Sequence, residues 1–432
     1  MTENNIPKHW QVLKLGDLCD KISNGANVKQ DDENTGLPIS RIETIWNETI
    51  DLRRVKYIKE SSSEFIEKYA LKRGDILFSH INSDLHLGKT AIYKNQVEIL
   101  IHGINLLLIR LKETVSSEFL NYQFKLKRSR GEFISIAQKS VNQSSINQSK
   151  LKNLEFIIPP LLEQQAIVSK IEELFSELDN GKQQLQTAQQ QLKVYRQSLL
   201  KWAFEGRFGY AQRPPNSVKD GKLPEGWKMI QIKDVAETFG GYAFKSGEFL
   251  KEGKYQVLRM GNVRPGLIRY NESPVFLNQV DESVLCRALL QINDIIITQT
   301  GTRKKRDYGF TALIKKENLL LNQRIATFRF NNMYLPKFFL YYSWTDLFKD
   351  QFFANETGNV GQGNVGMKAV TETLIPYCTL TEQQQIVDEL ESKLTVCDKI
   401  EETLSQSLLQ AETLRQSILK KAFEGKLLEF RN

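Results

Sequence analysis

The sequence is poor in cysteine and histidine, and it has no long hydrophobic run. Its four cysteines, Cys19, Cys286, Cys378 and Cys397, have no spacing typical of a zinc site or a disulfide framework. No apolar run reaches the ~18–20 residues that a membrane span requires, and the N-terminus lacks the hydrophobic segment of a signal peptide. We therefore expect a soluble, reduced, cytoplasmic protein without a membrane partner.

Motifs of several enzyme classes are also missing. There is no Walker A loop, no Gly-x-Ser-x-Gly elbow and no Asn/Asp-Pro-Pro-aromatic motif of the methyltransferase type. The spacing Gly361-x-Gly363-x-x-Gly366 matches a dinucleotide fingerprint by its letters only, because no buried strand precedes it and a poor helix start follows. Asp75 and Asp294 lack the further acid and lysine of a nuclease, so we interpret them as turn residues. No catalytic residue, metal site or cofactor site is predicted in this chain.

The charge is modestly positive and unevenly distributed. The 432 residues suffice for two or three domains, and 41% hydrophobic with 25% charged residues is an ordinary globular composition. Residues 1–160 contain 23 Lys and Arg against 19 Asp and Glu, and residues 205–378 contain 24 against 17. An excess of this kind makes an acidic partner such as nucleic acid a candidate.

The sequence repeats itself at an offset of 219 residues. EQQAIV at Glu163 leads to RQSLLKWAFEG ending at Gly206, and EQQQIV at Glu382 leads to RQSILKKAFEG ending at Gly425. The upstream regions match more loosely, for example in the Pro-x-x-Trp of PKHW and PEGW and in RGDILF and INDIII. Each half is therefore a mixed region of about 160 residues followed by a helix of about 40. Neutral drift after a duplication is the alternative, but it does not explain why surface-type residues such as EQQ stay matched.

Both repeated helical segments have apolar residues in alternating steps of three and four, which is typical of a heptad seam. A helix with a single apolar stripe must bury it, so we expect the two helices to pack together. Packing of each helix on its own mixed region is the alternative. Small residues, Gly181, Ala188, Ser407 and Ala411, are expected to allow a close approach. The predicted helix–helix and subunit contacts include Ile171, Leu178, Leu185, Leu192, Leu199, Leu390, Ile400, Leu404, Leu414 and Ile418.

The mixed regions are β-rich, with short apolar runs between turn residues. Helices are predicted around Ser117–Lys127 and Pro336–Phe353, which makes each region an α+β domain. The segment Arg207–Gly226 has three prolines among polar residues and is predicted to be a linker.

Two corresponding loops contain residues of the types that contact phosphates and base edges. Arg303, Lys304, Lys305 and Arg306 form a basic run in a glycine-bounded loop between predicted strands. The first-half loop contains instead His80, Asn82, His86 and Lys89. A solvated surface is the alternative interpretation of the basic run.

The two copies of the EQQ…FEG helix, each with its upstream Pro-x-x-Trp and Ile-Pro junction, resemble the specificity subunit of type I restriction–modification enzymes over nearly the whole chain. The resemblance implies an α+β protein with two pseudo-symmetric target-recognition domains separated by two long antiparallel coiled-coil helices. Each domain would read one half of a bipartite, asymmetric DNA site. The implied boundaries are 1–160 for the first domain, 161–206 for the central helix, 207–378 for the linker and second domain, and 379–432 for the C-terminal helix.

The resemblance also implies partners and a set of DNA-contacting residues. Such a subunit is not an enzyme: it binds double-stranded DNA and recruits two modification (methyltransferase) subunits, which use S-adenosylmethionine. Two restriction–translocation subunits, which use ATP and Mg²⁺, join in some systems, and the sequence leaves this open. The implied DNA-binding residues are Arg41, His80, Asn82, His86, Lys89, Asn142, Gln143, Ser144, Asn147, Arg259, Asn262, Thr300, Arg303, Lys304, Lys305, Arg306, Gln362 and Asn364.

Two other functions compete with this interpretation. One is a fused or self-sufficient DNA methyltransferase or nuclease chain, against which the missing methyl-donor motifs argue. The other is a coiled-coil adaptor that does not read DNA.

Lys393 departs from the pattern, because it interrupts the apolar seam of the second helix.

Overall fold

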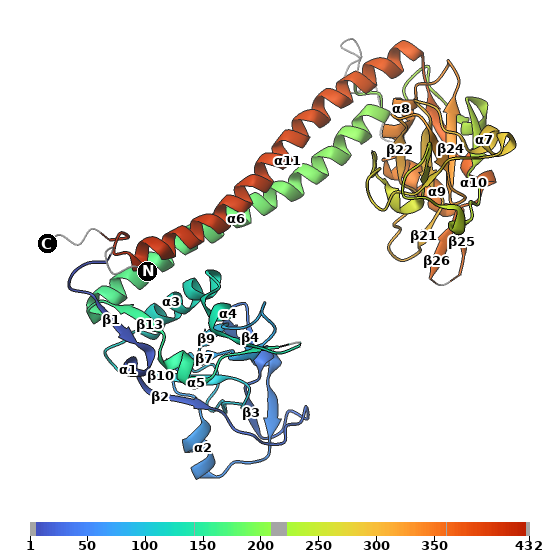
Figure 1. Ribbon diagram of the computed structural model, residues 1–432. Helices are drawn as coiled ribbons and strands as arrows, with labels where there is room; N and C mark the ends of the chain where they lie inside the picture. The colour runs from blue at the N-terminus through green and yellow to red at the C-terminus, as the bar shows by residue number, and fades with distance from the viewer. Residues whose placement is uncertain (1–5, 142, 209–222, 360, 429–432) are drawn as a thin grey trace. The chain divides into compact units, whose positions relative to one another are not determined.

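The computed structural model describes residues 6–141, 143–208, 223–359 and 361–428 (Figure 1). Most of the predicted linker, and Asn142 of the predicted DNA-contacting set, lie outside these residues. The chain divides into two compact units: unit 1 comprises residues 1–186 and 405–432, and unit 2 comprises residues 187–404. Each unit therefore contains one mixed region, the start of one long helix and the end of the other.

Unit 1 has a central antiparallel sheet with strand order β2-β10-β7-β9. The middle strands carry uninterrupted apolar residues, such as Ile76 to Phe78, because both of their faces are buried. Helix α3 contributes Phe124 to the core on one side of this sheet. The elements are β2 (Cys19–Asn24), β7 (Ile76–Phe78), β9 (Thr90–Ile92), β10 (Leu107–Leu111), α3 (Ser117–Ser129), α4 (Glu132–Ile136) and α5 (Gln148–Lys152).

Unit 2 repeats this sheet with strand order β15-β24-β20-β22. Ile76 pairs with Ile109 in unit 1, and Ile295 pairs with Phe328 in unit 2, so the register is the same at the sequence offset of 219. The elements are β15 (Ala236–Gly240), β20 (Ile295–Thr298), β22 (Thr311–Leu313), β24 (Ile325–Phe330), α7 (Glu282–Ala288) and α10 (Met367–Thr371).

Smaller sheets surround each central sheet. In unit 1 they pair β1 (Gln11–Lys14) with β13 (Glu155–Ile158), β3 (Leu37–Ile39) with β6 (Lys56–Ile58), and β4 (Ile45–Trp46) with β5 (Thr49–Ile50). In unit 2 they pair β14 (Lys228–Gln231) with β27 (Leu374–Tyr377), β17 (Val263–Arg264) with β18 (Leu267–Ile268), and β16 (Tyr255–Leu258) with both β19 (Phe276–Leu277) and β23 (Leu319–Leu321). Helices α1 (Leu15–Leu18) and α2 (Ser63–Tyr69) complete unit 1.

The two aspartates that precede the central strands are structural, and their interpretation as turn residues is confirmed. Asp75 accepts a hydrogen bond from the backbone N–H of Lys72 and forms an ion pair of 2.7 Å with Arg110. Asp294 does the same with the N–H of Gln291 and with Arg329, at 2.8 Å. Both carboxylates are almost fully buried, so each unit depends on its arginine to neutralise them.

The predicted helix around Pro336–Phe353 is wrong in one respect, because two helices occupy it. Helix α8 (Pro336–Tyr342) ends before Trp344, and α9 (Asp346–Ala354) begins after Thr345. The Thr345 hydroxyl accepts a hydrogen bond from the N–H of Phe348 and so caps the second helix.

Two helices of 44 residues each, α6 (Leu161–Phe204) and α11 (Leu380–Phe423), are the longest elements. At 1.5 Å per residue, each is ~66 Å long. Within unit 1, Arg415 binds Asp179 at 3.1 Å, and Lys182 binds Glu412. From the first pair to the second, the residue number rises in α6 and falls in α11, which confirms that the helices are antiparallel.

The predicted seam is buried mainly toward the helix ends. Ile171, Leu192, Leu199, Leu390 and Ile418 are buried, and Leu178, Leu185 and Leu404 are half-buried. Ile400 and Leu414 are 44% and 51% exposed, so the second helix leaves part of each side chain uncovered, and their predicted role in helix–helix or subunit contacts stays a prediction. In a pair of helices each seam is covered by one partner only. Seam positions at the edge of the contact therefore stay open to solvent.

The helices do not approach closely at Gly181, contrary to expectation. A Cβ added to Gly181 would meet no atom within 4 Å. Instead, a groove of about 870 Å³ lies between the helices of unit 1 and is lined by Leu174, Gly181, Ala411 and Leu414 among others. Lys393, which interrupts the apolar seam, has partners of its own. Its ammonium lies 5.5 Å from the centre of the Phe208 ring and 3.5 Å from a carboxylate oxygen of Glu389.

Each long helix begins with a buried anchor, and this explains the matched EQQ motifs. The Gln164 side chain is fully buried; it accepts a hydrogen bond from the N–H of Ser116 and donates to the carbonyls of Thr114 and Pro159. Glu163 accepts a hydrogen bond of 2.9 Å from the indole of Trp10. These two residues are therefore internal supports and not the surface residues that the sequence suggested.

Unit 2 has the same anchor. Gln383 is fully buried, accepts a hydrogen bond from the N–H of Leu335 and donates to the carbonyl of Cys378. Glu382 accepts a hydrogen bond of 2.6 Å from the indole of Trp227. The tryptophan of each Pro-x-x-Trp motif thus binds the glutamate of the EQQ motif in the same unit.

The glycine that ends each long helix completes this junction. Gly206 and Gly425 have φ angles of +71° and +69°, as expected for a helix C-terminus. A Cβ on Gly206 would lie 2.3 Å from Cγ of Pro224, and a Cβ on Gly425 would lie 2.5 Å from Cγ of Pro7. All the motifs that repeat most clearly in the sequence therefore meet at one junction in each unit.

We expect Gln164→Ala to destabilise the protein by about 2–4 kcal/mol, because it removes a buried side chain and leaves the N–H of Ser116 and the carbonyls of Thr114 and Pro159 without this partner. Gln165→Ala is the matched control, since Gln165 is the next residue of the same helix and is exposed; its effect should stay within about 0.5 kcal/mol. Urea-induced unfolding of the full chain measures both. Equal effects would contradict the anchoring role of Gln164.

Candidate nucleic-acid interface

The two loops predicted to contact DNA in the first domain lie side by side. Strand β8 (Ile81–Asn82) pairs with β12 (Ser144–Ser145), which in turn pairs with β11 (Gln138–Lys139). Asn82 is directly opposite Ser144. Segments more than 60 residues apart in the sequence therefore form one small polar sheet in unit 1.

The second domain builds the same sheet from equivalent residues. Strand β26 (Gln362–Asn364) pairs with β21 (Thr300–Thr302) and β25 (Thr357–Gly358). Figure 1 shows these three strands extending together from the rest of unit 2. Thr300 is opposite Asn364, and its hydroxyl donates a hydrogen bond of 2.9 Å to the Asn364 Oδ1. The fold thus brings the predicted residues together in both copies.

In unit 1 the polar residues of this sheet are held by side-chain hydrogen bonds. The Ser144 hydroxyl donates to Asp84 at 2.5 Å, and the Asn82 amide donates to Ser79 at 3.2 Å. The Asn147 side chain caps helix α5 by accepting a hydrogen bond from the N–H of Lys150. Gln143 and Asn147 are both exposed, and only the Asn147 side chain is engaged in this cap, which leaves the Gln143 side chain open to a ligand.

His80 lies behind the sheet and is a support for it. Its side chain is buried, and desolvation lowers its pKa to about 4, so the imidazole is neutral at pH 7. The backbone carbonyl of His80 accepts a hydrogen bond from the N–H of Ile146. The equivalent residue of unit 2, Gln299, is also buried and donates a hydrogen bond to the carbonyl of Val365.

In the rest of the first loop, Lys89 and His86 lie close to the positive charge of Arg128. Desolvation, followed by the nearby charge of Arg128, lowers the pKa of Lys89. Desolvation also lowers the pKa of His86, with Lys89 and Arg128 as further causes. Arg128 donates hydrogen bonds to the carbonyls of Leu85 and Leu87 and so fixes the loop.

The basic run of unit 2 is fixed at its two arginines. Arg303 Nε donates a hydrogen bond of 2.8 Å to Glu356, which also accepts a hydrogen bond from the Tyr308 hydroxyl. The Arg306 guanidinium lies 4.7 Å from the centre of the Phe353 ring. Lys304 and Lys305, between them, are exposed. The structure thus separates two positioning arginines from two lysines that face solvent.

Arg41 and Arg259 occupy the same place in the two units. Each precedes a short 3₁₀ helix, η2 (Ile42–Thr44) or η6 (Met260–Asn262). The N–H of Arg41 donates to the hydroxyl of Thr44, and the N–H of Arg259 donates to the amide oxygen of Asn262. Asn262 is 3% exposed, which makes it a support of the turn and leaves the arginine as the accessible group.

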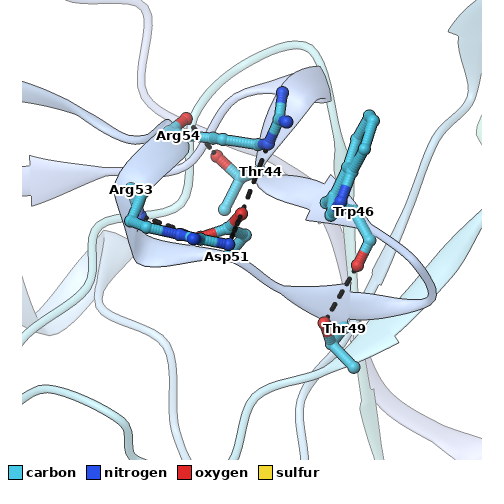
Figure 2. Close-up of polar contacts among 6 residues, drawn as sticks. All are labelled: Thr44, Trp46, Thr49, Asp51, Arg53 and Arg54. Atoms are coloured by element: carbon cyan, nitrogen blue, oxygen red, sulfur yellow. Dashed lines mark hydrogen bonds and ion pairs between the residues drawn. The ribbon is translucent and has the colours of Figure 1, made fainter. Parts of the chain in front are cut away.

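The chain after Arg41 forms a cationic cluster that the sequence analysis missed. Figure 2 shows Asp51 between Arg53 and Arg54, with the β4–β5 turn carrying Trp46 alongside. The Arg54 guanidinium lies 3.8 Å from the centre of the Trp46 ring, which is 45% exposed. Hydrogen bonds from Arg53 lower the pKa of Asp51 to about 2. The consecutive arginines in DLRRV, close to an exposed tryptophan, were the available sequence signal.

Two cavities lie between the predicted segments of unit 2. One, of about 490 Å³, is lined by Arg259 and Asn262 together with Gln323 and Arg324. The other, of about 650 Å³, is lined by Thr300, Gln362 and Asn364, again together with Gln323 and Arg324. The first cavity is also lined by Met260 and by Glu272, while the arginines and amides of both cavities are groups that can hydrogen-bond to phosphates and base edges.

The described ranges show no group of three or more His, Cys, Asp or Glu residues that could hold a metal ion. The four cysteines are free. Among the helices that the structure describes, none has the length and apolar character needed to cross a membrane. The segments that form the candidate interface carry mainly amide, hydroxyl and cationic side chains.

Comparisons with known proteins agree with this architecture. The family model for the type I restriction modification DNA specificity domain matches the chain twice, over residues 7–189 and 224–410. A Methanocaldococcus jannaschii protein named as a specificity subunit of the type I restriction enzyme MjaX is 34% identical over 304 residues, which are 68% of this chain and 69% of that protein.

Two solved structures have the same fold. One comes from work on complex assembly and conformational transition of the type I R-M system; it is 18% identical, covers 98% of this chain and 99% of its own, and has a TM-score of 0.72. The other is the HsdS subunit from Thermoanaerobacter tengcongensis, 18% identical, covering 99% of this chain and 100% of its own, with a TM-score of 0.61.

Proposed function

Because the chain belongs to the type I restriction modification DNA specificity family, we propose that it is the non-catalytic subunit that recognises DNA in a type I restriction–modification complex. The observation that carries this proposal is the pair of equivalent polar sheets, β8-β12-β11 in unit 1 and β21-β26-β25 in unit 2. Each sheet joins loops that the family resemblance assigns to the DNA face. A fused methyltransferase or nuclease is not favoured, since the repeated family domain accounts for most of the chain.

In this proposal residues 1–160 read one half of a bipartite site and residues 207–378 read the other. The supporting observation is that equivalent positions differ in chemistry while the backbone register is conserved. Ser144 and Asn82 in unit 1 correspond to Gly363 and Gly301 in unit 2, and the exposed lysines of the basic run have no counterpart in the shorter first loop. Different side chains on the same frame suit two different short sequences.

The two long helices are proposed to set the separation of the half-sites and to recruit two modification subunits. Exposed apolar residues on them support a contact with other chains: Leu162 is 80% exposed, Val194 67% and Leu409 71%, besides Ile400 and Leu414. S-adenosylmethionine, and ATP with Mg²⁺ where restriction–translocation subunits join, would be bound by these partners. Cellular DNA as the target places the proposed complex in the cytoplasm.

We expect an exchange of residues 1–160 for the same region of another specificity subunit to change one half-site only. Trp10 and Glu163 anchor this region, and Trp227 and Glu382 form the same contact in the second half. A junction that both halves share should accept a foreign domain. Long-read mapping of methylated bases in cells that express the chimera with its modification subunits gives both half-sites and their gap. A change in both half-sites, or no bipartite motif in the parent, would contradict the proposal.

We expect Lys304→Ala and Lys305→Ala to weaken DNA binding at all sequences alike, because both side chains are exposed and can reach phosphates. Each should reduce the slope of log affinity against log salt by ~0.9 if one phosphate contact is lost. Lys233→Ala is the control: Lys233 is exposed, but it lies in η4 (Ile232–Asp234), beside β14. Binding titrations of the complex at several salt concentrations measure this, and equal slopes for all three variants would show that the run is only a solvated surface.

We expect the gap of the recognised site to lengthen by about three base pairs when one heptad is added to each long helix. Seven residues add ~10 Å of helix, and DNA rises ~3.4 Å per base pair. The insertions belong after Gln189 in α6 and after Leu404 in α11, because the ion pairs Asp179–Arg415 and Arg196–Asp398 place these points opposite each other. Methylation mapping reads the gap, and a gap that stays unchanged in a complex that still methylates would refute the helices as its ruler.

A further inference from the structure

We propose that Arg324 is a base-reading residue at the centre of the second recognition surface and that it binds a guanine. This inference rests on the proposed function and names a determinant of its specificity. Arg324 lies in the turn between β23 and β24, outside every segment that the sequence and the family resemblance assigned to the DNA face.

Its position joins two groups of predicted residues. Gln323 and Arg324 line the cavity beside Arg259 and Asn262, and the same two residues line the cavity beside Gln362. The turn therefore lies between the η6 segment and the β21-β26-β25 sheet, within one unit. A ligand that contacted both of these groups would pass over Arg324.

The backbone of this turn is held on several sides. The carbonyl of Arg324 accepts a hydrogen bond of 3.0 Å from the N–H of Gln299, and the N–H of Asn322 donates to the carbonyl of Leu258. Gly241 packs so closely that a Cβ there would lie 2.0 Å from the carbonyl oxygen of Asn322. A side chain on such a turn starts from a fixed Cα, which lowers the entropy lost on binding.

The guanidinium of Arg324 is uncommitted, unlike those of its neighbours. Arg259 donates to the carbonyl of Ser273, Arg264 to the carbonyl of Gly261, and Arg269 to Glu272. Across the residues that the structure describes, the exposed Arg324 side chain has no hydrogen bond or ion pair. All five of its N–H donors are available, and a planar fork of this kind matches O6 and N7 of guanine in the major groove.

The first unit has a different residue at this place. At the offset of 219 the equivalent of Arg324 is Asn105, which is exposed and precedes β10 as Arg324 precedes β24. An asparagine amide matches adenine and cannot replace the arginine fork. A change from a cation to a neutral amide at one framework position is what two unlike half-sites require.

The test compares three variants of the full chain in complex with its modification subunits. Arg324→Gln removes the charge and the fork, and Arg324→Lys keeps the charge but removes the fork. Arg287→Gln is the matched control, because Arg287 is an exposed arginine of the same unit in helix α7, away from both cavities. Methylation mapping and binding to cognate and single-mismatch DNA are measured, with unfolding midpoints to establish that each variant is folded.

The expected result is that Arg324→Gln weakens cognate binding by about 5- to 150-fold and relaxes one base pair of the second half-site, with the first half-site unchanged. Arg324→Lys should relax the same base pair with the parental salt dependence, and Arg287→Gln should behave as the parent. Equal weakening at cognate and mismatched DNA would identify a phosphate contact and overturn base reading. An unchanged motif in Arg324→Gln beside a normal parent would overturn the role of Arg324 alone, whereas a parent without a bipartite motif would overturn the proposed function itself.

Discussion

A buried glutamine at the start of each long helix is the interaction on which the rest of the structure depends. Gln164 and Gln383 each satisfy backbone groups from the mixed region and from the residues before the helix, in an environment closed to water. These hydrogen bonds connect the start of each helix to the mixed region of its own unit and favour one orientation between them. The glutamate before each glutamine, bound to a tryptophan indole, fixes the chain where the mixed region begins. Rigid junctions of this kind let a long helix serve as a frame.

The same frame leaves the recognition loops free to vary. The central sheets keep one register in both units, and the buried pairs Asp75–Arg110 and Asp294–Arg329 hold the same strands. The loops leave these strands at the same points, so a change of side chain or of loop length does not disturb the core. The first loop is nearly neutral and its Asp84 accepts a hydrogen bond from Ser144, whereas the second carries two exposed lysines. This division between a conserved frame and variable loops is the physical basis for reading two unlike sequences with one duplicated fold.

Much of this organisation could be predicted from the sequence, because a repeat and an apolar periodicity can both be recognised without knowing the fold. The offset of 219, the strands and the two helices follow from them, as does the correspondence between loops of the two halves. The pairing of β8 with β12 and of β21 with β26 joins segments far apart in the sequence and was not predicted. Burial of a polar residue leaves no such signal, so Gln164 looked like a surface residue until its partners were visible. The exposure of Ile400 and Leu414 depends on how completely one helix covers another, which heptad positions do not encode. Arg324 was missed for a related reason: only the folded chain brings its turn between two distant segments.

This chain is proposed to supply sequence recognition to subunits that supply the chemistry. The most direct measurement is base-resolution mapping of methylation on one DNA library, treated with the purified modification subunits alone, with this chain alone, and with both. An asymmetric bipartite motif is expected only when both are present. Methylation by this chain alone, or the same motif without it, would contradict the account.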